Sequence, residues 1–361
     1  MHSPPPYRAV RLALIGTPEF YFPEALSEAG VVGGDMRRSS FEPPYDLPVT
    51  WDAGGHPTQL PVVGLHASGL VRGFRRDGVP VGSLNRPGQG YLQPGYWGPS
   101  DFLLLPQDGL GGQAISGTDS FVFGQTFYPT ATPGQISISA TIWDAGGTHV
   151  VGGLAAVDSF AWAVNGDGVF VGVTIDRSDP TDYDYGGFIG RGTAATRLAF
   201  PGFTEVQAYA INDDGWFTGV WEPAFATQRG YLARWDLDTG GREIYDLGIF
   251  PGYGETVAYA INNDRTVVGG AQQLGGDFDR ALIWWRGSLT PQDLNLFVDI
   301  PGATLIDAYR INNAGQILAE ARLHAGGYAY YVLTPVPEPA GLCLHAAIVA
   351  SLVRRPRRRV A

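Results

Sequence analysis

Three segments in the second half of the chain repeat one pattern: Ala208-Tyr-Ala-Ile-Asn-Asp-Asp-Gly215, Ala258-Tyr-Ala-Ile-Asn-Asn-Asp-Arg265 and Ala308-Tyr-Arg-Ile-Asn-Asn-Ala-Gly315. In each segment, alternating apolar residues lead into Asn, Asp or Gly, which tolerate the positive φ angles of a tight turn. A short apolar segment follows, such as Val267-Val-Gly269. The pattern therefore predicts a β-hairpin that recurs every 50 residues.

Weaker copies of this hairpin pattern extend toward the N-terminus. They lie at Ala161-Trp-Ala-Val-Asn-Gly-Asp-Gly168, Ile115-Ser-Gly-Thr-Asp119, Leu65-His-Ala-Ser-Gly69 and Leu26-Ser-Glu-Ala-Gly30. A second series of large apolar residues is spaced by 46 or 50 positions. Its members are Trp51, Trp97, Trp143, Ile189, Trp235, Trp285 and Tyr331. The two series agree on seven units.

Each unit has room for about four short strands, because another tight turn follows the recurring Trp, as in Trp51-Asp-Ala-Gly-Gly55. Repeats of roughly 40 to 50 residues with four strands are typical of β-propeller blades, and a closed ring protects edge strands. We therefore predict an all-β propeller of about seven four-stranded blades, with six blades as the alternative. The propeller would occupy residues 21–333, after a poorly defined start at 1–20 and before a separate tail at 334–361, which combines a Pro-rich linker with a short apolar helix.

The composition suits a β-rich chain with a packed core. Apolar residues make up 44% of the chain and aromatic residues 12%, while 51 Gly and 27 Pro supply turns. The single cysteine, Cys343, lies in the tail, so the body has no thiol for a disulfide, a Cys-based zinc site or a Cys nucleophile. The net charge of −11 opposes a nucleic-acid backbone, and we expect no nucleic-acid partner.

No catalytic or metal-binding motif is evident in the body. No two His residues have metal-ligand spacing, and no nucleophile elbow or phosphate-binding loop is present. The acidic loop 176–184, like Asp236 and Asp238, has oxygen ligands suited to Ca²⁺ but lacks EF-hand spacing, so solvated turns are the simpler interpretation. We therefore expect no metal, no cofactor and no catalytic residue, and hence a non-catalytic body.

One enzymatic alternative stays open, because acids from distant blades can meet in a propeller without any sequence spacing that reveals them. This alternative is a hydrolase or lyase that acts on polysaccharide. It requires a cluster of acids or His residues at one mouth of the ring.

The recurring aromatic residues have two interpretations. Sugar rings pack on aromatic faces, which makes exposed Tyr183, Tyr185 and Tyr253 candidates for carbohydrate binding. A Trp that recurs once per unit is first a packing residue, because buried aromatics dominate core energetics. The Trp residues expected in the core are Trp51, Trp143, Trp235 and Trp285.

The tail has three parts in a fixed order. The Pro-rich segment Val336-Pro-Glu-Pro339 precedes an apolar stretch, 340–353. A cluster of basic residues follows: Arg354, Arg355, Arg357, Arg358 and Arg359. A helix over the apolar stretch would be about 21 Å long, short of the roughly 30 Å hydrocarbon core, so we expect transient membrane contact with the arginines on the cytoplasmic side.

This tail resembles the PEP-CTERM sorting signal of exopolysaccharide-forming Gram-negative bacteria. The resemblance implies that an exosortase, a membrane cysteine transpeptidase, recognises Val336, Pro337, Glu338 and Pro339 and removes the tail. The basic cluster, 354–359, would anchor the tail during processing.

The later repeats, from about 140 to 333, resemble the HAF repeat of bacterial extracellular proteins. The matching segments are Ala281-Leu-Ile-Trp-Trp285, Asp246-Leu-Gly248 and Ala258-Tyr-Ala-Ile-Asn-Asn263. That family has no assigned catalytic residues, so the resemblance supplies no active site.

Together these features predict an exported, surface-sorted repeat protein with a non-catalytic binding or structural role in the cell envelope or extracellular matrix. Its expected partners are the exosortase and extracellular polysaccharide. The first residues lack a basic region, and Arg11 interrupts the apolar run 9–16, so we expect an export leader upstream of Met1. A cytosolic interaction propeller with an accidental tail is the third interpretation.

Overall fold

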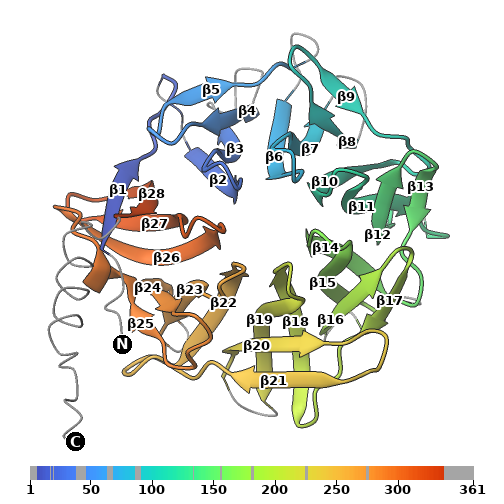
Figure 1. Cartoon of the computed structure of the whole chain (residues 1–361). Coiled ribbons are helices and arrows are strands. Elements are labelled where there is room, and N and C mark those ends of the chain that lie inside the picture. Colours follow the sequence, from blue (N-terminus) through green and yellow to red (C-terminus); the bar gives the residue numbers. More distant parts are fainter. Residues whose placement is uncertain are drawn as a thin grey trace, which may run out of the picture.

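The computed structural model describes residues 6–16, 18, 20–37, 46–62, 68–85, 91–132, 134–154, 157–179, 183–223, 227–273 and 276–336. The strands in these ranges form seven four-stranded antiparallel sheets, arranged as blades around a central axis (Figure 1). One short 3-10 helix, η1 (Leu294–Phe297), accompanies them in the described part of the chain. The predicted all-β propeller is confirmed, with seven blades rather than six.

The blades follow chain order, and each runs from its inner strand outward. Blade 1 contains β2 (Phe20–Leu26), β3 (Val32–Arg37), β4 (Asp46–Trp51) and β5 (Pro57–Gln59). Blade 2 contains β6 (Ser68–Phe74), β7 (Pro80–Asn85), β8 (Gln93–Trp97) and β9 (Phe102–Leu104). Blade 3 contains β10 (Gly111–Gly117), β11 (Val122–Pro129), β12 (Ile136–Asp144) and β13 (Gly147–Val150). Blade 4 contains β14 (Asp158–Val164), β15 (Val169–Asp176), β16 (Asp184–Arg191) and β17 (Ala194–Arg197).

The remaining blades have the same layout. Blade 5 contains β18 (Phe203–Ile211), β19 (Trp216–Pro223), β20 (Arg229–Trp235) and β21 (Arg242–Asp246). Blade 6 contains β22 (Glu255–Ile261), β23 (Val267–Gln272), β24 (Phe278–Trp284) and β25 (Gln292–Asp293). Blade 7 contains β26 (Ala303–Ile311), β27 (Ile317–Leu323) and β28 (Tyr328–Pro335), and its outermost strand is β1 (Tyr7–Arg11).

The strand β1 closes the ring. It pairs with β28, with Tyr7 opposite Pro335 and Arg11 opposite Tyr331. The backbone N–H of Val336 extends this pairing by donating to the Pro6 carbonyl, at 2.8 Å. Blade 7 therefore takes strands from both ends of the described chain, and the edge of β28 is covered.

The second strand of a blade lies very close to the inner strand, and a glycine permits this approach. A Cβ atom on Gly219 would overlap the carbonyl oxygen of Gln207, and one on Gly269 would overlap that of Val257. The same inner-strand overlap would occur in four other blades, at Gly34, Gly82, Gly124 and Gly172. A glycine at this position of the return strand therefore permits the close approach in six blades, and Ala319 occupies the position in blade 7.

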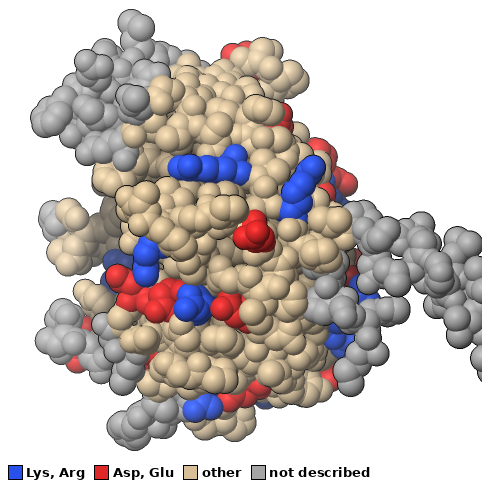
Figure 2. All heavy atoms as spheres, turned by 90° about the vertical axis from the view of Figure 1, so that its left-hand side faces the viewer, with Lys and Arg blue, Asp and Glu red and all other residues tan. Residues whose placement is uncertain are grey.

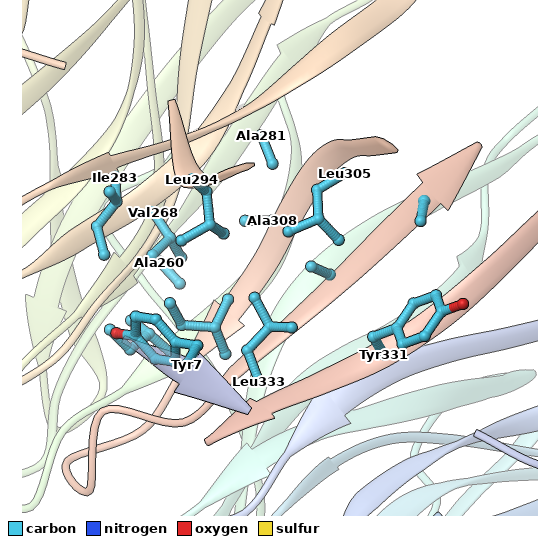
Figure 3. Close-up of a cluster of buried hydrophobic side chains, with 14 of the residues drawn as sticks. Tyr7, Ala260, Val268, Ala281, Ile283, Leu294, Leu305, Ala308, Tyr331 and Leu333 are labelled. Atoms are coloured by element: carbon cyan, nitrogen blue, oxygen red, sulfur yellow. The ribbon is translucent and has the colours of Figure 1, made fainter. Parts of the chain in front are cut away.

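Tryptophan side chains from the third strands pack in the core and bond to adjacent loops. The buried rings of Trp51, Trp97, Trp143 and Trp284 each donate an indole N–H to a backbone carbonyl on an adjacent loop. Burial of Trp51 and Trp143 in the core is confirmed. Figure 3 shows one cluster between blades 6 and 7, where Tyr7 of β1 packs with Ala260, Ile283, Leu294 and Leu333.

Trp285 and Trp235, also expected in the core, pack against core clusters but are only half-buried. Trp284, not Trp285, lies opposite Val267 and is fully buried, while Trp285 is half-buried and its ring lies 5.5 Å from that of Phe297. Trp235 is half-buried at the end of β20, under the Arg242 guanidinium. A shift of one residue in a strand moves a side chain to the other face, which a repeat period alone does not reveal.

This difference predicts unequal costs for two neighbouring substitutions. We expect Trp284→Ala to lower the free energy of unfolding by about 3–5 kcal/mol, because it leaves a cavity in the core. Trp285→Ala is the matched control and should cost clearly less, because its ring is half-buried. Urea unfolding followed by circular dichroism measures both values. An equal or larger loss for Trp285→Ala would contradict the register described here.

Candidate functional site

The inner strand of every blade has a β-bulge at the same place. Pairing with the second strand skips one residue there, as between Ala208 and Ala210 in β18. The skipped residues are Glu24, Arg72, Ile115, Trp162, Tyr209, Tyr259 and Tyr309. A bulge leaves its extra residue unpaired and re-aims the side chain. These seven residues, called the bulge ring below, line the central channel.

Two cavities lie along the channel. The aromatic cavity, of about 600 Å³, extends toward the beginnings of the inner strands and includes Phe22, Phe160 and Gln207. The turn-side cavity, of about 290 Å³, extends toward the hairpin turns and includes Asn165 and Asp213. The residues that line both cavities are Arg72, Trp162, Tyr209, Tyr259 and Arg310. These shared residues mark where the two cavities meet.

One side of the channel is a row of aromatic rings from blades 4 to 7. Neighbouring ring centroids are 5.3 Å apart for Trp162 and Tyr209, 6.1 Å for Tyr209 and Tyr259, and 5.8 Å for Tyr259 and Tyr309. Tyr330 of β28 continues the row, 6.3 Å from Tyr309. Trp162 stays 40% exposed although it lies at the centre of the molecule. The row therefore presents ring surface to the channel.

The tyrosine hydroxyls of this row are neutral at physiological pH. Burial raises the pKa of Tyr209, Tyr259 and Tyr309 well above the ordinary value, and nearby carboxyl groups add to the shift. The hydroxyl of Tyr209 donates to Gln207 at 2.9 Å, and that of Tyr309 donates to Glu320 at 2.6 Å. The row thus offers polar, uncharged groups beside its apolar faces.

The charged groups of the bulge ring come from blades 1 and 2. Glu24 and Arg72 form an ion pair there. A further guanidinium, that of Arg310, follows Tyr309 in β26 and lines both cavities. Its Nη1 donates to the Tyr309 carbonyl at 2.8 Å. The wall of the aromatic cavity therefore combines two arginines and one carboxylate with the aromatic row.

Two buried carboxyl groups lie outside the cavity walls. Burial raises the pKa of Asp35, in β3, to about 7, and the charge of Glu24 raises it further while that of Arg72 opposes the shift. Burial also raises the pKa of Asp307, in β26, well above the ordinary range. Neither residue lines the two cavities. Both shifts favour the uncharged form, and Asp35 becomes mostly neutral as the pH falls below about 7.

Asparagine side chains hold neighbouring hairpin turns together. The Nδ2 of Asn165 donates to the Asn212 carbonyl at 3.0 Å, and Asn212 donates in the same way to Asn262 at 3.0 Å. Asn262 donates to Asn312 at 3.3 Å, and Asn312 closes the series on the Ser27 carbonyl of blade 1 at 3.0 Å. Each Oδ1 also accepts a backbone N–H from its own turn. This asparagine belt links blades 4 to 7 and blade 1.

The sequence identified the hairpins but misplaced one of them. In blade 2 the hairpin turn is Arg75 to Val79, closed by a 2.9 Å backbone hydrogen bond, and not the segment that begins at Leu65. Residues 65–67 of that segment lie outside the described residues. Because Arg72 belongs to the correct hairpin, this error hid Arg72 as a member of the bulge ring. The tyrosine members could have been found from the sequence, because Tyr209 and Tyr259 each precede the repeated Ala-Ile-Asn.

The aromatic residues proposed for carbohydrate binding have different positions. Tyr185 lines the aromatic cavity. Tyr183 is exposed and lines neither cavity, and Tyr253 packs locally on Phe250 with ring centroids 5.4 Å apart. The Tyr residues of the bulge ring were not singled out from the sequence.

The tail residues fall mostly beyond the described chain. Val336 follows β28 and is 40% exposed. Pro337, Glu338, Pro339, the apolar stretch 340–353 and the basic cluster 354–359 lie outside the described residues. Within the part that the structure describes, no helix is long and apolar enough to cross a membrane.

The described parts of the acidic loops contain turns in which an Asp side chain accepts a backbone N–H. Asp176 Oδ1 accepts the Ser178 N–H at 2.9 Å, and Asp236 Oδ1 accepts the Asp238 N–H at 2.9 Å. Over the described ranges, no three His, Cys, Asp or Glu side chains are grouped so that they could hold a metal ion.

Comparisons with known proteins show the fold and no family. No family model and no curated protein matches the chain. The β-propeller domain of the Trilobed protease from Pyrococcus furiosus is similar, with a TM-score of 0.57 and 8% identity over 88% of this chain and 94% of that one. Its topology is described as an open velcro, whereas β1 completes blade 7 here.

A prolyl endopeptidase is also similar, with a TM-score of 0.52 and 9% identity. The match covers 92% of this chain and 51% of that one, so this chain spans about half the length of the endopeptidase.

These comparisons overturn the expectation of a non-catalytic body. A protease and a prolyl endopeptidase have similar propellers, so the fold and the missing motifs give no ground for excluding catalysis. The physical reason is that a propeller channel gathers side chains from every blade. Glu24 and Arg310 meet on one cavity although they lie in the first and last blades, which no short motif records.

The raised pKa of Asp35 predicts that stability falls as pH rises. The unfolded chain releases this proton near pH 4, whereas the folded chain releases it near 7, so the folded state binds the proton more tightly. The contribution is greatest below pH 4 and is lost as the pH passes 7. We expect Asp35→Asn to reduce the slope of unfolding free energy against pH by up to about 1.4 kcal/mol per unit.

Urea unfolding at several pH values between about 4 and 8 measures this slope. Asp307 contributes with the same sign, so the slope should be reduced rather than abolished. Asp214→Asn, at an exposed turn position, is the control and should follow the wild type. An unchanged slope for Asp35→Asn would contradict the prediction.

Proposed function

We propose that this chain is an exported, surface-sorted propeller that binds polysaccharide of the cell envelope or extracellular matrix in its aromatic cavity. The observation that carries the proposal is the row of rings formed by Trp162, Tyr209, Tyr259 and Tyr309. The apolar faces of sugar rings pack on aromatic faces, and sugar hydroxyls pair with polar groups such as Gln207. The volume of about 600 Å³ lies within the roughly 300–1,000 Å³ range of ligand sites.

The outer surface supports a ligand site in the channel. Figure 2 shows the side of the molecule that faces left in Figure 1, where blade 7 and β1 lie. Acidic and basic side chains alternate on this side, and no patch of one sign stands out. This side therefore shows no charged patch of one sign that would compete with the channel as a ligand site.

Export and sorting rest on the tail sequence. We infer that an exosortase recognises Val336, Pro337, Glu338 and Pro339 and removes the tail after transient membrane contact by 340–353. The half-exposed Val336 follows the last strand, so the proposed recognition segment begins at the propeller surface. A polysaccharide-rich surface would then be the place where the channel meets its ligand.

Cleavage of the bound glycan is the second candidate function. It is favoured by the presence of Glu24, Arg72 and the Tyr309 side chain on one cavity, since carboxylates and tyrosines are groups that perform acid and base chemistry. Mass spectrometry of the glycan after incubation distinguishes the two functions. Shorter products that require Glu24 would extend the proposal from binding to cleavage.

We expect Trp162→Ala and Tyr259→Ala to weaken glycan binding about 2- to 10-fold each, because an aromatic contact contributes roughly 0.5–1.5 kcal/mol. Titration calorimetry with oligosaccharides prepared from exopolysaccharide of the native host measures the effect. Tyr245→Ala, on the outermost strand of blade 5, is the control and should leave affinity unchanged. No binding by the wild type, or an equal loss in the control, would refute the channel as the site.

Replacing Pro337, Glu338 and Pro339 with Ala tests the sorting proposal. In the native host, we expect the wild type to lose its tail and to be found outside the inner membrane, while the variant keeps its tail. Intact mass and cell fractionation measure the two properties. If both forms keep the full mass and stay in the cytoplasm, the tail is not a sorting signal.

A further inference from the structure

We propose that the aromatic cavity selects acidic glycans, and that Arg310 binds the carboxylate of a sugar acid such as a uronate. This inference rests on the proposed glycan-binding function and adds the chemical class of the ligand.

The first argument is the charge of the cavity wall. The charged residues that line the aromatic cavity are Glu24, Arg72 and Arg310, which leaves one positive charge in excess. The chain as a whole has a net charge of −11. A positive wall inside an acidic protein attracts an anion into the channel, because the low-dielectric walls of a cavity strengthen the local field.

The second argument is that Arg310 forms no ion pair with a described residue. Arg72 already pairs with Glu24, but no carboxylate of the described residues lies within ion-pair distance of the Arg310 guanidinium. Burial lowers the pKa of Arg310, the charge of Glu24 opposes this shift, and the arginine stays protonated at neutral pH. A desolvated cation is costly unless an anion pairs with it, and this one lines both cavities.

The third argument is that raised pKa values favour the uncharged forms of the titratable groups near Arg310. Tyr259 and Tyr309 keep their protons, because burial raises the pKa of each hydroxyl. Burial also raises the pKa of Asp307, two residues before Tyr309, which favours its uncharged form. These shifts reduce the negative charge that the two tyrosines and Asp307 place beside Arg310.

The geometry of the side chains favours a carboxylate carried on a sugar. A guanidinium forms two parallel hydrogen bonds with a planar carboxylate, which a single ammonium group does not do. The aromatic row that includes Trp162 and Tyr259 supplies the stacking surface for the sugar ring itself. One residue of a uronate-containing chain would use both features at once.

The test compares galacturonate oligosaccharides with the same oligosaccharides after methyl esterification, which removes the charge and keeps the sugar framework. We expect the full-length protein to bind the acidic form at least tenfold more tightly by calorimetry at low salt. Arg310→Gln should remove this preference while binding of the ester stays within about twofold. Retained ester binding also shows that the variant is folded.

Two further variants make the result specific. Arg310→Lys keeps the charge without the planar fork and should retain part of the preference. Arg191→Gln, at a half-exposed arginine on blade 4, should behave as the wild type.

Each contrary result identifies what has failed. Equal affinity of the wild type for acid and ester would overturn the inference and leave glycan binding intact. Binding of neither form, together with no binding of host exopolysaccharide, would refute both. Tighter binding of a sulfated galactan oligosaccharide than of the galacturonate would overturn the assignment to a carboxylate.

Discussion

The structure depends on the hydrogen bonds that the asparagine belt makes from blade to blade. Each Asn orders its own turn through Oδ1 and reaches the next turn through Nδ2, as Asn212 does between Trp216 and Asn262. The last member, Asn312, reaches Ser27 in blade 1 across 285 positions of sequence. Because these side chains are buried, losing one would leave polar groups without partners, which costs roughly 1–3 kcal/mol. The belt and the β1 pairing together close the ring and place the inner strands around the channel.

The bulges of the inner strands provide the side chains that line the channel. Each inner strand packs through its paired residues, while the extra residue at the bulge is released from the pairing. The bulge position therefore accepts Glu24, Ile115 or Tyr209 in otherwise similar blades. Blade packing and channel chemistry are set by different positions of one short strand, which explains how a common propeller fold accommodates different functions.

Charge is distributed in a complementary way. The chain is acidic overall, yet Arg72 and Arg310 bring positive charge to the cavity wall. Burial raises the pKa of the carboxyl groups of Asp35 and Asp307, which favours their uncharged forms. The aromatic row adds neutral hydroxyls and apolar faces. These features explain why the channel, rather than the outer surface, is the candidate site for an acidic glycan.

The sequence by itself favoured seven blades over six, because each blade repeats a local hairpin with recognisable turn residues, and the structure has seven. The sequence also correctly predicted that Trp51 and Trp143 are buried. It placed Trp285 where Trp284 packs, since one residue of register in a strand reverses the face. Only the tertiary structure decided that Glu24 and Arg310 share a cavity. Bulges and ring closure arise from pairing between strands and blades, and this pairing joins residues whose separation along the chain leaves no local pattern.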